Sequence, residues 1–118
     1  MKRVLILDDE KEICFLLAAL LTKMGYSADI AYTLEEGFSK IAEQAFDVVF
    51  LDLNLPDGLG YKIVPDIKDQ DQRTKVVMIS AHDGLLKKIG AETPGIDYII
   101  TKPFNRTNIT EALSELDA

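Results

Sequence analysis

Near its middle the chain reads VVFLD over residues 48–52, four apolar side chains in succession followed by an aspartate. An unbroken apolar run of this length is typical of a strand buried on both faces, as in a parallel sheet covered by helices. Similar runs occur at 4–7, 76–79 and 99–100. A fifth strand candidate at 28–32 mixes polar and apolar residues, which predicts a strand at the edge of the sheet.

The segments between these runs repeat with the 3.6-residue period of amphipathic helices. Gly25 is expected to end the first helix, and Thr33 with Glu36 forms a capping box that begins the second. The third helix is expected over 58–69, with Pro65 either kinking it or delaying its start. The apolar stripe expected on the first helix comprises Ile13, Leu16, Leu17, Leu20, Leu21 and Met24.

A short fourth helix is expected over 84–92, and a fifth begins after Asn105 or Thr107, either of which can cap its first turn. The order is thus five repeats of strand then helix. Right-handed crossovers convert such repeats into a parallel sheet with helices on both faces. We therefore expect one doubly wound α/β domain over residues 1–118.

Composition limits the classes of function. Twenty Asp and Glu residues against thirteen Lys and Arg give a formal net charge of -7, and a negative field repels phosphate backbones and anionic lipid headgroups. We therefore expect this domain to bind neither nucleic acid nor membranes. The apolar run 4–7 is too short for a signal peptide, which predicts a cytoplasmic protein. Cys14 is the only cysteine, so no internal disulfide is possible, and we expect a packed thiol.

Polar residues follow the expected strands. Asp8 and Asp9 follow the first strand, and Asp52 ends the third. Ser80 follows the fourth strand, and Lys102 follows the fifth. Parallel strands present their carboxyl ends at one edge of a sheet, and ligands bind there at the point where the strand order reverses. We therefore expect these residues, from four separate segments, to share one site.

The chemistry of such a cluster follows from its charge. Two carboxylates about 4 Å apart repel by roughly 4 kcal/mol at an effective dielectric of about 20, so the acidic residues need nearby positive charge. Lys102 supplies one charge, and Asp8, Asp9 and Asp52 with a backbone carbonyl form the oxygen set that Mg²⁺ prefers. A carboxylate beside Mg²⁺ and an ammonium can attack a phosphoryl donor and form an aspartyl phosphate. Asp52, alone on a central strand, is the expected acceptor, with Ser80 and Lys102 binding phosphate oxygens.

This pattern resembles the receiver domain of two-component response regulators. The motifs that carry the resemblance are, in chain order, Asp8-Asp9, LDLNLPDGLG at 51–60, Ser80-Ala81 and Lys102-Pro103-Phe104. They span essentially the whole chain in the family's order and spacing. The resemblance implies a flavodoxin-like fold with strand order 2-1-3-4-5 and five helices. It also implies that Asp52 is phosphorylated by a histidine kinase or a histidine phosphotransfer protein.

The resemblance further assigns the metal ligands. It implies that Asp9 and Asp52 bind Mg²⁺ directly, that Asp8 acts largely through water, and that Asn54 contributes its backbone carbonyl. On this interpretation the protein catalyses its own phosphorylation and slow dephosphorylation and is not an enzyme acting on an outside substrate. Its downstream target is an unknown protein, which we expect to dock on the face built by the fourth helix, fifth strand and fifth helix.

The sequence departs from the family at one position. The switch aromatic lies three residues before the lysine, where this chain has Ile99. Tyr98 is one place earlier, so strand alternation predicts that it faces elsewhere. We therefore expect switching to rest on movement of the fourth helix and its flanking loops. The resemblance also implies a cis bond between Lys102 and Pro103. His82 is expected to be an exposed loop residue, although its position would also allow it to approach the phosphoryl site.

Two other classes of protein share part of this pattern. A phosphatase of the haloacid-dehalogenase type also uses a strand-end aspartate and magnesium, but that family has a second carboxylate two residues after its nucleophile. This chain has Asn54 at that position. The other class is a receiver-like module that binds partners without being phosphorylated. The complete set of aspartates, serine and lysine argues against that class.

Overall fold

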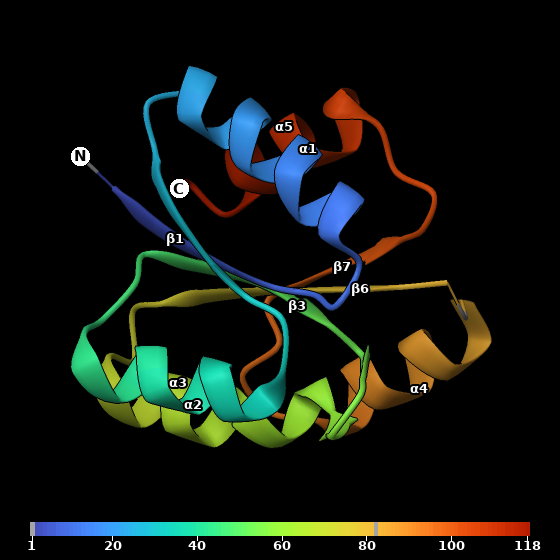
Figure 1. Cartoon of the computed structure of the whole chain (residues 1–118). Coiled ribbons are helices and arrows are strands. Elements are labelled where there is room, and N and C mark those ends of the chain that lie inside the picture. The colour runs from blue at the N-terminus through green and yellow to red at the C-terminus, as the bar shows by residue number, and fades with distance from the viewer. Residues whose placement is uncertain (1, 82) are drawn as a thin grey trace.

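Five strands of the protein form a parallel sheet in the order β2-β1-β3-β6-β7 (Figure 1). This is a computed structural model that describes residues 2–81 and 83–118, without the side chains at 83, 86 and 87. All four strand pairings in this sheet are parallel. Numbered along these five strands, the order is 2-1-3-4-5, which confirms the expected topology. The strands are β1 (Arg3–Leu7), β2 (Ser27–Ala31), β3 (Val48–Asp52), β6 (Lys75–Ser80) and β7 (Tyr98–Thr101).

Helices cover both faces of the sheet. Figure 1 shows α1 and α5 on one face and α2, α3 and α4 on the other. The inner strands lie between two apolar layers, which is why the sequences of β1, β3 and β6 are mainly apolar rather than alternating. The helices are α1 (Lys11–Lys23), α2 (Leu34–Glu43), α3 (Val64–Gln70), α4 (Asp83–Glu92) and α5 (Arg106–Glu115).

The central strand β3 divides its side chains between two cores. Val49 and Leu51 pack in the core beneath α2 and α3, whereas Val48 and Phe50 pack in the core beneath α1 and α5. All four side chains are at most 1% exposed, and complete burial of each contributes about 1.5–3 kcal/mol. The apolar run therefore fixes β3 in the middle of the sheet, and Asp52 is placed at its carboxyl end.

The third helix differs from the one expected over 58–69. After β3 the chain forms a small antiparallel hairpin, β4 (Asn54–Leu55) and β5 (Gly58–Leu59), and then a 3₁₀-helix, η1 (Gly60–Ile63). Pro65 occupies the first turn of α3, where its missing N–H costs no hydrogen bond. Of the two effects expected of this proline, a delayed start is the one observed.

The first helix turns most of the expected stripe toward the sheet, with Leu16 as the exception. Its buried residues are Cys14, Leu17 and Leu21, so the interpretation of Cys14 as a packed thiol is confirmed. Leu16 is 68% exposed and its neighbour Phe15 is 74% exposed. The prediction for Leu16 was therefore wrong, because this residue lies about 100° around the helix from Leu17.

Two helix caps match the sequence pattern. The Thr33 side chain accepts a hydrogen bond from the Glu36 backbone N–H at 3.1 Å. The Asn105 side chain likewise caps α5, through the backbone N–H of Asn108 at 2.9 Å, which selects Asn105 over Thr107 as the cap. Within the described ranges, the structure contains no helix that combines the length and the hydropathy of a membrane span.

Candidate functional site

The carboxyl ends of β1 and β3 bring the acidic residues together. Leu7 is paired with Leu51 in the sheet register, so Asp8 and Asp52, each one residue further along, lie side by side at the same edge. Asp9 follows at the start of the connection to α1. One carboxylate oxygen from each of Asp8, Asp9 and Asp52 can be chosen so that all three lie within 4.8 Å of one another. The clustering expected from the sequence is confirmed.

Burial distinguishes the three carboxylates. Asp8 and Asp52 are 3% and 6% exposed, whereas Asp9 is exposed. The oxygens of Mg²⁺ ligands lie 2.0–2.1 Å from the ion, so those on opposite sides of an octahedron are about 4 Å apart. The carboxylate oxygens of the cluster lie within 4.8 Å of one another, which is close to that separation, and they are the hard oxygens that Mg²⁺ prefers.

Lys102 supplies the positive charge of the cluster. Its Nζ atom lies 3.0 Å from Asp8 Oδ2 and 3.6 Å from Asp52 Oδ1. A third carboxylate, Glu10, places its Oε1 atom 3.2 Å from the same Nζ. The predicted approach of Lys102 to Asp52 is confirmed. The sequence also shows Glu10 directly after Asp8-Asp9, but adjacency alone does not reveal that its side chain would reach Lys102.

Burial, together with the negative charge of Asp8, raises the pKa of Asp52 from 3.8 to about 7. Burial is the largest cause, because it disfavours the charged form. The negative charge of Asp8 raises this pKa further, and the ammonium of Lys102 partly offsets the increase. Burial also disfavours the charged form of Lys102, but its hydrogen bond to Asp8 and the charge of Asp52 outweigh burial and raise the Lys102 pKa. Further positive charge would therefore stabilise the ionised carboxylates of the site.

The Cys14 thiol lies directly behind the acidic cluster. Its Sγ atom donates a hydrogen bond to the backbone carbonyl of Asp8 at 3.1 Å. Burial, followed by the charge of Asp8, raises the pKa of Cys14 to about 12. Such a thiol carries almost no thiolate at neutral pH and is unreactive. Cys14 therefore packs against the turn that carries Asp8 and supports it.

A profile of the response regulator receiver domain family matches residues 4–114. The chain belongs to this family. Response regulator ArlR of Staphylococcus aureus is 32% identical over 118 residues, which are 100% of this chain and 52% of that protein. Transcriptional regulatory protein DltR of Streptococcus agalactiae is 32% identical over 102 residues, or 86% of this chain and 46% of that protein. The receiver domain described here thus spans about half the length of the curated relatives it matches.

Solved structures agree with this assignment. A CheY-like receiver domain protein from Methanospirillum hungatei JF-1 superimposes with a TM-score of 0.89 at 30% identity, covering 99% of this chain and 94% of that one. Response regulator TrrA from Thermotoga maritima, solved in complex with Mg²⁺ and BeF, gives a TM-score of 0.85 at 28% identity. That comparison covers 98% of this chain and 99% of TrrA. The chain is thus a receiver domain of the two-component type, with the expected flavodoxin-like fold.

The remaining predicted site residues occupy the same edge of the receiver domain. Ser80 ends β6 at 1% exposure, and its backbone carbonyl accepts a hydrogen bond from the Lys102 N–H at 2.8 Å. Asn54 is exposed and begins β4, two residues after Asp52. The peptide bond between Lys102 and Pro103 is cis, as the resemblance implied. His82 lies outside the described residues.

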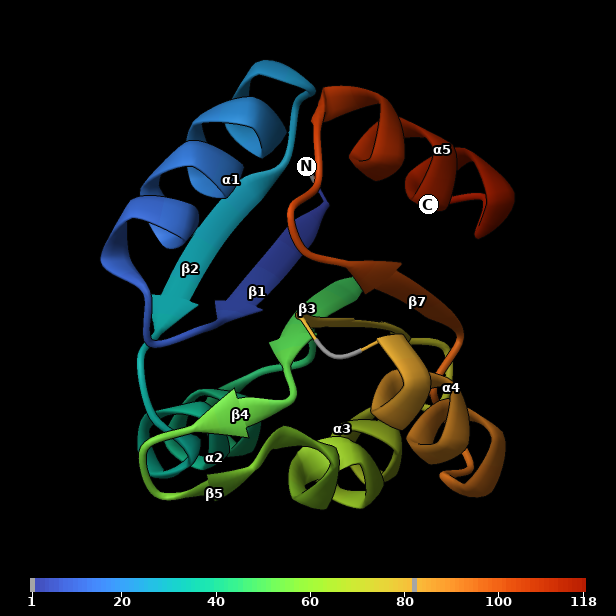
Figure 2. The same ribbon diagram turned by 90° about the vertical axis from the view of Figure 1, so that its right-hand side faces the viewer.

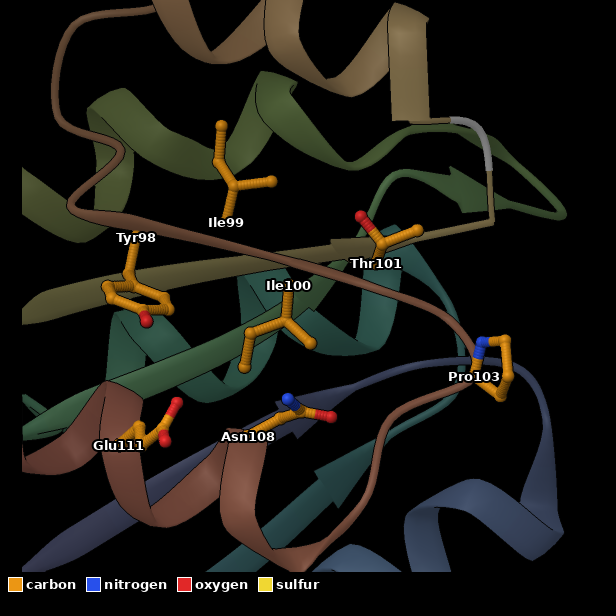
Figure 3. Close-up of a pocket in the computed structure, with 7 residues that line it drawn as sticks. All are labelled: Tyr98, Ile99, Ile100, Thr101, Pro103, Asn108 and Glu111. Carbon is orange, nitrogen blue, oxygen red and sulfur yellow. The ribbon is translucent and has the colours of Figure 1, made fainter.

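The side chains of Tyr98 and Ile99 lie as the departure from the family pattern predicts. Ile99 and Tyr98 point to opposite sides of β7 (Figure 3). Ile99 packs with the core on the α2 and α3 side, and Tyr98 packs with the core on the α1 and α5 side. Position 99 of this receiver domain therefore carries an isoleucine side chain where the family has its switch aromatic.

Proposed function

We propose that this receiver domain accepts a phosphoryl group on Asp52 from a histidine kinase or a histidine phosphotransfer protein, in a magnesium-dependent reaction. The observation that carries the proposal is the placement of Asp52, buried at the end of β3 with two further carboxylates within 4.8 Å and the Lys102 ammonium at 3.6 Å. An aspartate in that setting has a nucleophilic oxygen beside groups that can receive the charge of a phosphoryl group.

The proposed transfer forms one bond and breaks one. A carboxylate oxygen of Asp52 bonds to phosphorus, the bond between phosphorus and the donor imidazole nitrogen breaks, and the imidazole takes up a proton. Lys102 pairs with a phosphate oxygen once Asp52 has given up its negative charge to the new bond. Ser80 donates its hydroxyl hydrogen to another phosphate oxygen. Hydrolysis of the aspartyl phosphate by water then returns Asp52 and releases phosphate.

Magnesium is the cofactor that suits the oxygens at this edge. In our proposal the ion is held by Asp9 and Asp52 directly, by Asp8 largely through water, and by the backbone carbonyl of Asn54. When bound, the ion offsets the repulsion among the carboxylates and the charge on the phosphoryl oxygens. The complex of TrrA with Mg²⁺ and BeF supports this proposal, since that protein has the same fold at 28% identity.

The phosphodonor must reach Asp52 over the loops at the carboxyl edge. Phe15 and Leu16 lie one to two turns into α1, which begins directly after Glu10, and their side chains are 74% and 68% exposed. An exposed pair of large apolar side chains is typical of a protein contact surface. We propose that the donor protein covers this pair while it presents its phosphohistidine to Asp52.

The output partner is proposed to be another protein surface that meets α4, β7 and α5. Strand β7 is an edge strand, and a pocket of about 250 Å³ lies between it and α5 (Figure 3). ArlR and DltR are named as regulators and are about twice as long as this chain. The negative charge of the domain argues against direct nucleic-acid binding, and both that absence and a cytoplasmic location stay predictions.

Incubation with acetyl phosphate, with and without MgCl₂, tests the proposed chemistry. Intact mass spectrometry should show one added phosphoryl group in the wild-type protein only when magnesium is present. Asp52→Asn should show none. Asp66→Asn is a matched control, because it removes an exposed carboxylate of α3 that does not belong to the cluster of Asp8, Asp9 and Asp52, and it should be labelled like the wild type.

Other results of these assays would support other functions. Failure to label the wild type with acetyl phosphate, or to bind beryllium fluoride, would favour a module that acts without phosphorylation. Labelling of Asp52→Asn to the same extent would place the acceptor elsewhere. Multiple turnover of p-nitrophenyl phosphate would indicate a phosphatase and contradict the proposal.

A further inference from the structure

The hairpin formed by β4 and β5 contacts the start of α2, away from the carboxylate cluster. Asp57 is at the tip of the hairpin formed by β4 and β5, and its carboxylate accepts hydrogen bonds from two backbone N–H groups of α2. Oδ1 accepts from Leu34 at 2.8 Å, and Oδ2 accepts from Glu35 at 3.0 Å. Figure 2 shows the hairpin beside this helix. Both carboxylate oxygens thus tie the hairpin to a segment more than twenty residues earlier in the chain.

The hairpin needs such a tie because it is very short. Its two strands contain two residues each, and an isolated hairpin is at best marginally stable in water. Its base is held by a hydrogen bond from the Gly60 N–H to the Leu53 carbonyl at 2.7 Å. A Cβ atom at Gly60 would collide with the backbone carbonyl of Asp52, so this close return of the chain requires glycine.

Asn54 lies between the two anchors. The base of the loop is fixed at Leu53 and Gly60, and its tip is fixed at Asp57. At the tip, Leu34 also approaches Gly58 so closely that an added Cβ would lie 2.8 Å from Leu34 Cδ1. The path of the backbone through Asn54 is therefore determined at both ends by contacts outside the β4 strand itself.

We propose that Asp57 is a positioning residue for the magnesium site, which it serves by clamping the hairpin to α2 and so fixing the backbone carbonyl of Asn54. This inference rests on the proposed function. Asp57 touches neither the ion nor the phosphoryl group; it acts through the loop. Groups that orient a metal ligand from outside the coordination sphere commonly change metal affinity by roughly 10- to 100-fold when they are removed.

The charge of Asp57 suits this role. Hydrogen bonds from the backbone of Leu34 and then Glu35 lower the pKa of Asp57, so the carboxylate stays ionised at neutral pH. The positive end of the helix dipole favours a carboxylate at this place. The clamp is thus made throughout the pH range in which the acceptor site operates.

The same helix end provides a matched control. Thr33 caps α2 through the Glu36 N–H at 3.1 Å, so Thr33 and Asp57 share the free N–H groups of one helix terminus. Only Asp57 belongs to the hairpin. Thr33→Ala therefore weakens the same helix end and leaves the hairpin base unchanged.

Titration of the full chain with MgCl₂, followed by two-dimensional NMR of the backbone amides, tests the proposal. Asp57→Ala should raise the dissociation constant for Mg²⁺ roughly tenfold and shift the amide signals of Asn54 and Gly60. Asp57→Asn keeps one acceptor oxygen and should have a smaller effect. Thr33→Ala should change the dissociation constant less than twofold, and urea unfolding of each variant shows how far stability has changed.

The results separate this inference from the proposed function. If wild-type protein binds Mg²⁺ and is labelled by acetyl phosphate, but Asp57→Ala binds Mg²⁺ as tightly as the wild type, the positioning role is overturned. Equal weakening by Asp57→Ala and Thr33→Ala would also overturn it, since a general loss of helix stability would explain both. If the wild type binds no Mg²⁺ at all, the proposed function itself fails.

Discussion

The Nζ atom of Lys102 lies closer to Asp8 than to Asp52, at 3.0 Å from Asp8 Oδ2 and 3.6 Å from Asp52 Oδ1. Among the described residues, Lys102 supplies the only ammonium near the cluster. Its shorter contact is thus with Asp8, a proposed metal-site residue, and not with Asp52, the proposed acceptor. Burial and the charge of Asp8 accordingly outweigh Lys102 at Asp52 and raise its pKa to about 7. This uneven pairing has consequences for stability and for metal binding.

Asp52→Asn should make the protein more stable in magnesium-free buffer near pH 8. The Asp52 pKa is about 7 in the folded protein against 3.8 for the unperturbed group. The folded state therefore holds a proton that the unfolded state releases between these values, so stability falls as the pH rises from about 4 to about 7 and stays lower above. Asparagine cannot ionise, and removal of this cost should raise the free energy of unfolding by on the order of 2–4 kcal/mol at pH 8.

Urea unfolding of both proteins at pH 4 and pH 8 measures the effect. The difference between Asp52→Asn and wild type should be large at pH 8 and small at pH 4, where the carboxyl is protonated in the folded state and partly protonated in the unfolded state. A difference that does not depend on pH would show that packing, rather than charge, causes it.

Magnesium affinity should fall as the pH is lowered through 7. Binding of Mg²⁺ requires ionised carboxylates, and Asp52 takes up a proton in this range because its pKa is about 7. If one proton is displaced from Asp52, the dissociation constant at pH 6 should be about tenfold higher than at pH 8. Isothermal titration calorimetry in buffers of different ionisation enthalpy would also count the protons released, and a count near zero at pH 6 would contradict the assignment.

Lys102→Met should destabilise the protein, and magnesium should restore part of the loss. The substitution leaves Asp8 and Asp52 buried without their ammonium partner, and removal of one member of a buried ion pair costs about 3–5 kcal/mol. A divalent ion can replace some of the missing charge. Urea unfolding at pH 8 with and without 10 mM MgCl₂, a concentration of roughly the order needed to fill a weak site, tests this expectation.

Lys68→Met serves as the matched control for Lys102→Met. Lys68 pairs with Asp97 at 2.9 Å, on the loop that leads into β7 and at the opposite end of this strand from Lys102. Its loss should also lower stability, but magnesium should recover no more than it does for the wild type. Equal recovery in both variants would mean that the ion acts on the whole protein and not at the acidic cluster.

The parts of the fold that the sequence predicts are those with strong local signals. The apolar runs 48–51 and 76–79 are unbroken because the strands are covered on both faces. The grouping of the acidic residues follows from their positions at the strand ends alone. The hairpin of β4 and β5 could not be predicted in the same way, since two-residue strands are too short to show a period of two. Its contact through Asp57 joins segments that only the folded chain brings together.

Side-chain reach limited the prediction of the site in a similar way. Asp8, Asp9 and Asp52 could be grouped because their positions on the backbone suffice to place them. Glu10 follows them directly, but its contact with Lys102 depends on the direction of a long side chain. The prediction that Leu16 is buried was wrong for another reason. A period of 3.6 residues does not define the centre of a helix stripe to better than one position. In α1 the small residue Cys14 is buried instead.

The contact between Gly90 and Ile99 should couple α4 to β7. A Cβ atom at Gly90 would collide with Ile99 Cδ1, so the isoleucine at the family's aromatic position fits against a glycine of α4. Gly90→Ala adds that Cβ in the last turn of α4 and should displace either Ile99 or the helix. The gain in helix propensity from glycine to alanine, about 1 kcal/mol, opposes this cost, and the single variant should therefore change stability little.

A double-mutant cycle isolates the contact. Ile99→Val removes the Cδ1 atom and should cost about 0.5–1.5 kcal/mol on its own. In Gly90→Ala/Ile99→Val the added Cβ meets no Cδ1, so the helix gains the propensity of alanine without the collision. The double variant should therefore be more stable than the sum of the single changes by at least about 0.5 kcal/mol. Strict additivity in urea unfolding would show that α4 and β7 are not coupled through this pair, and any switching through α4 would then have to start elsewhere.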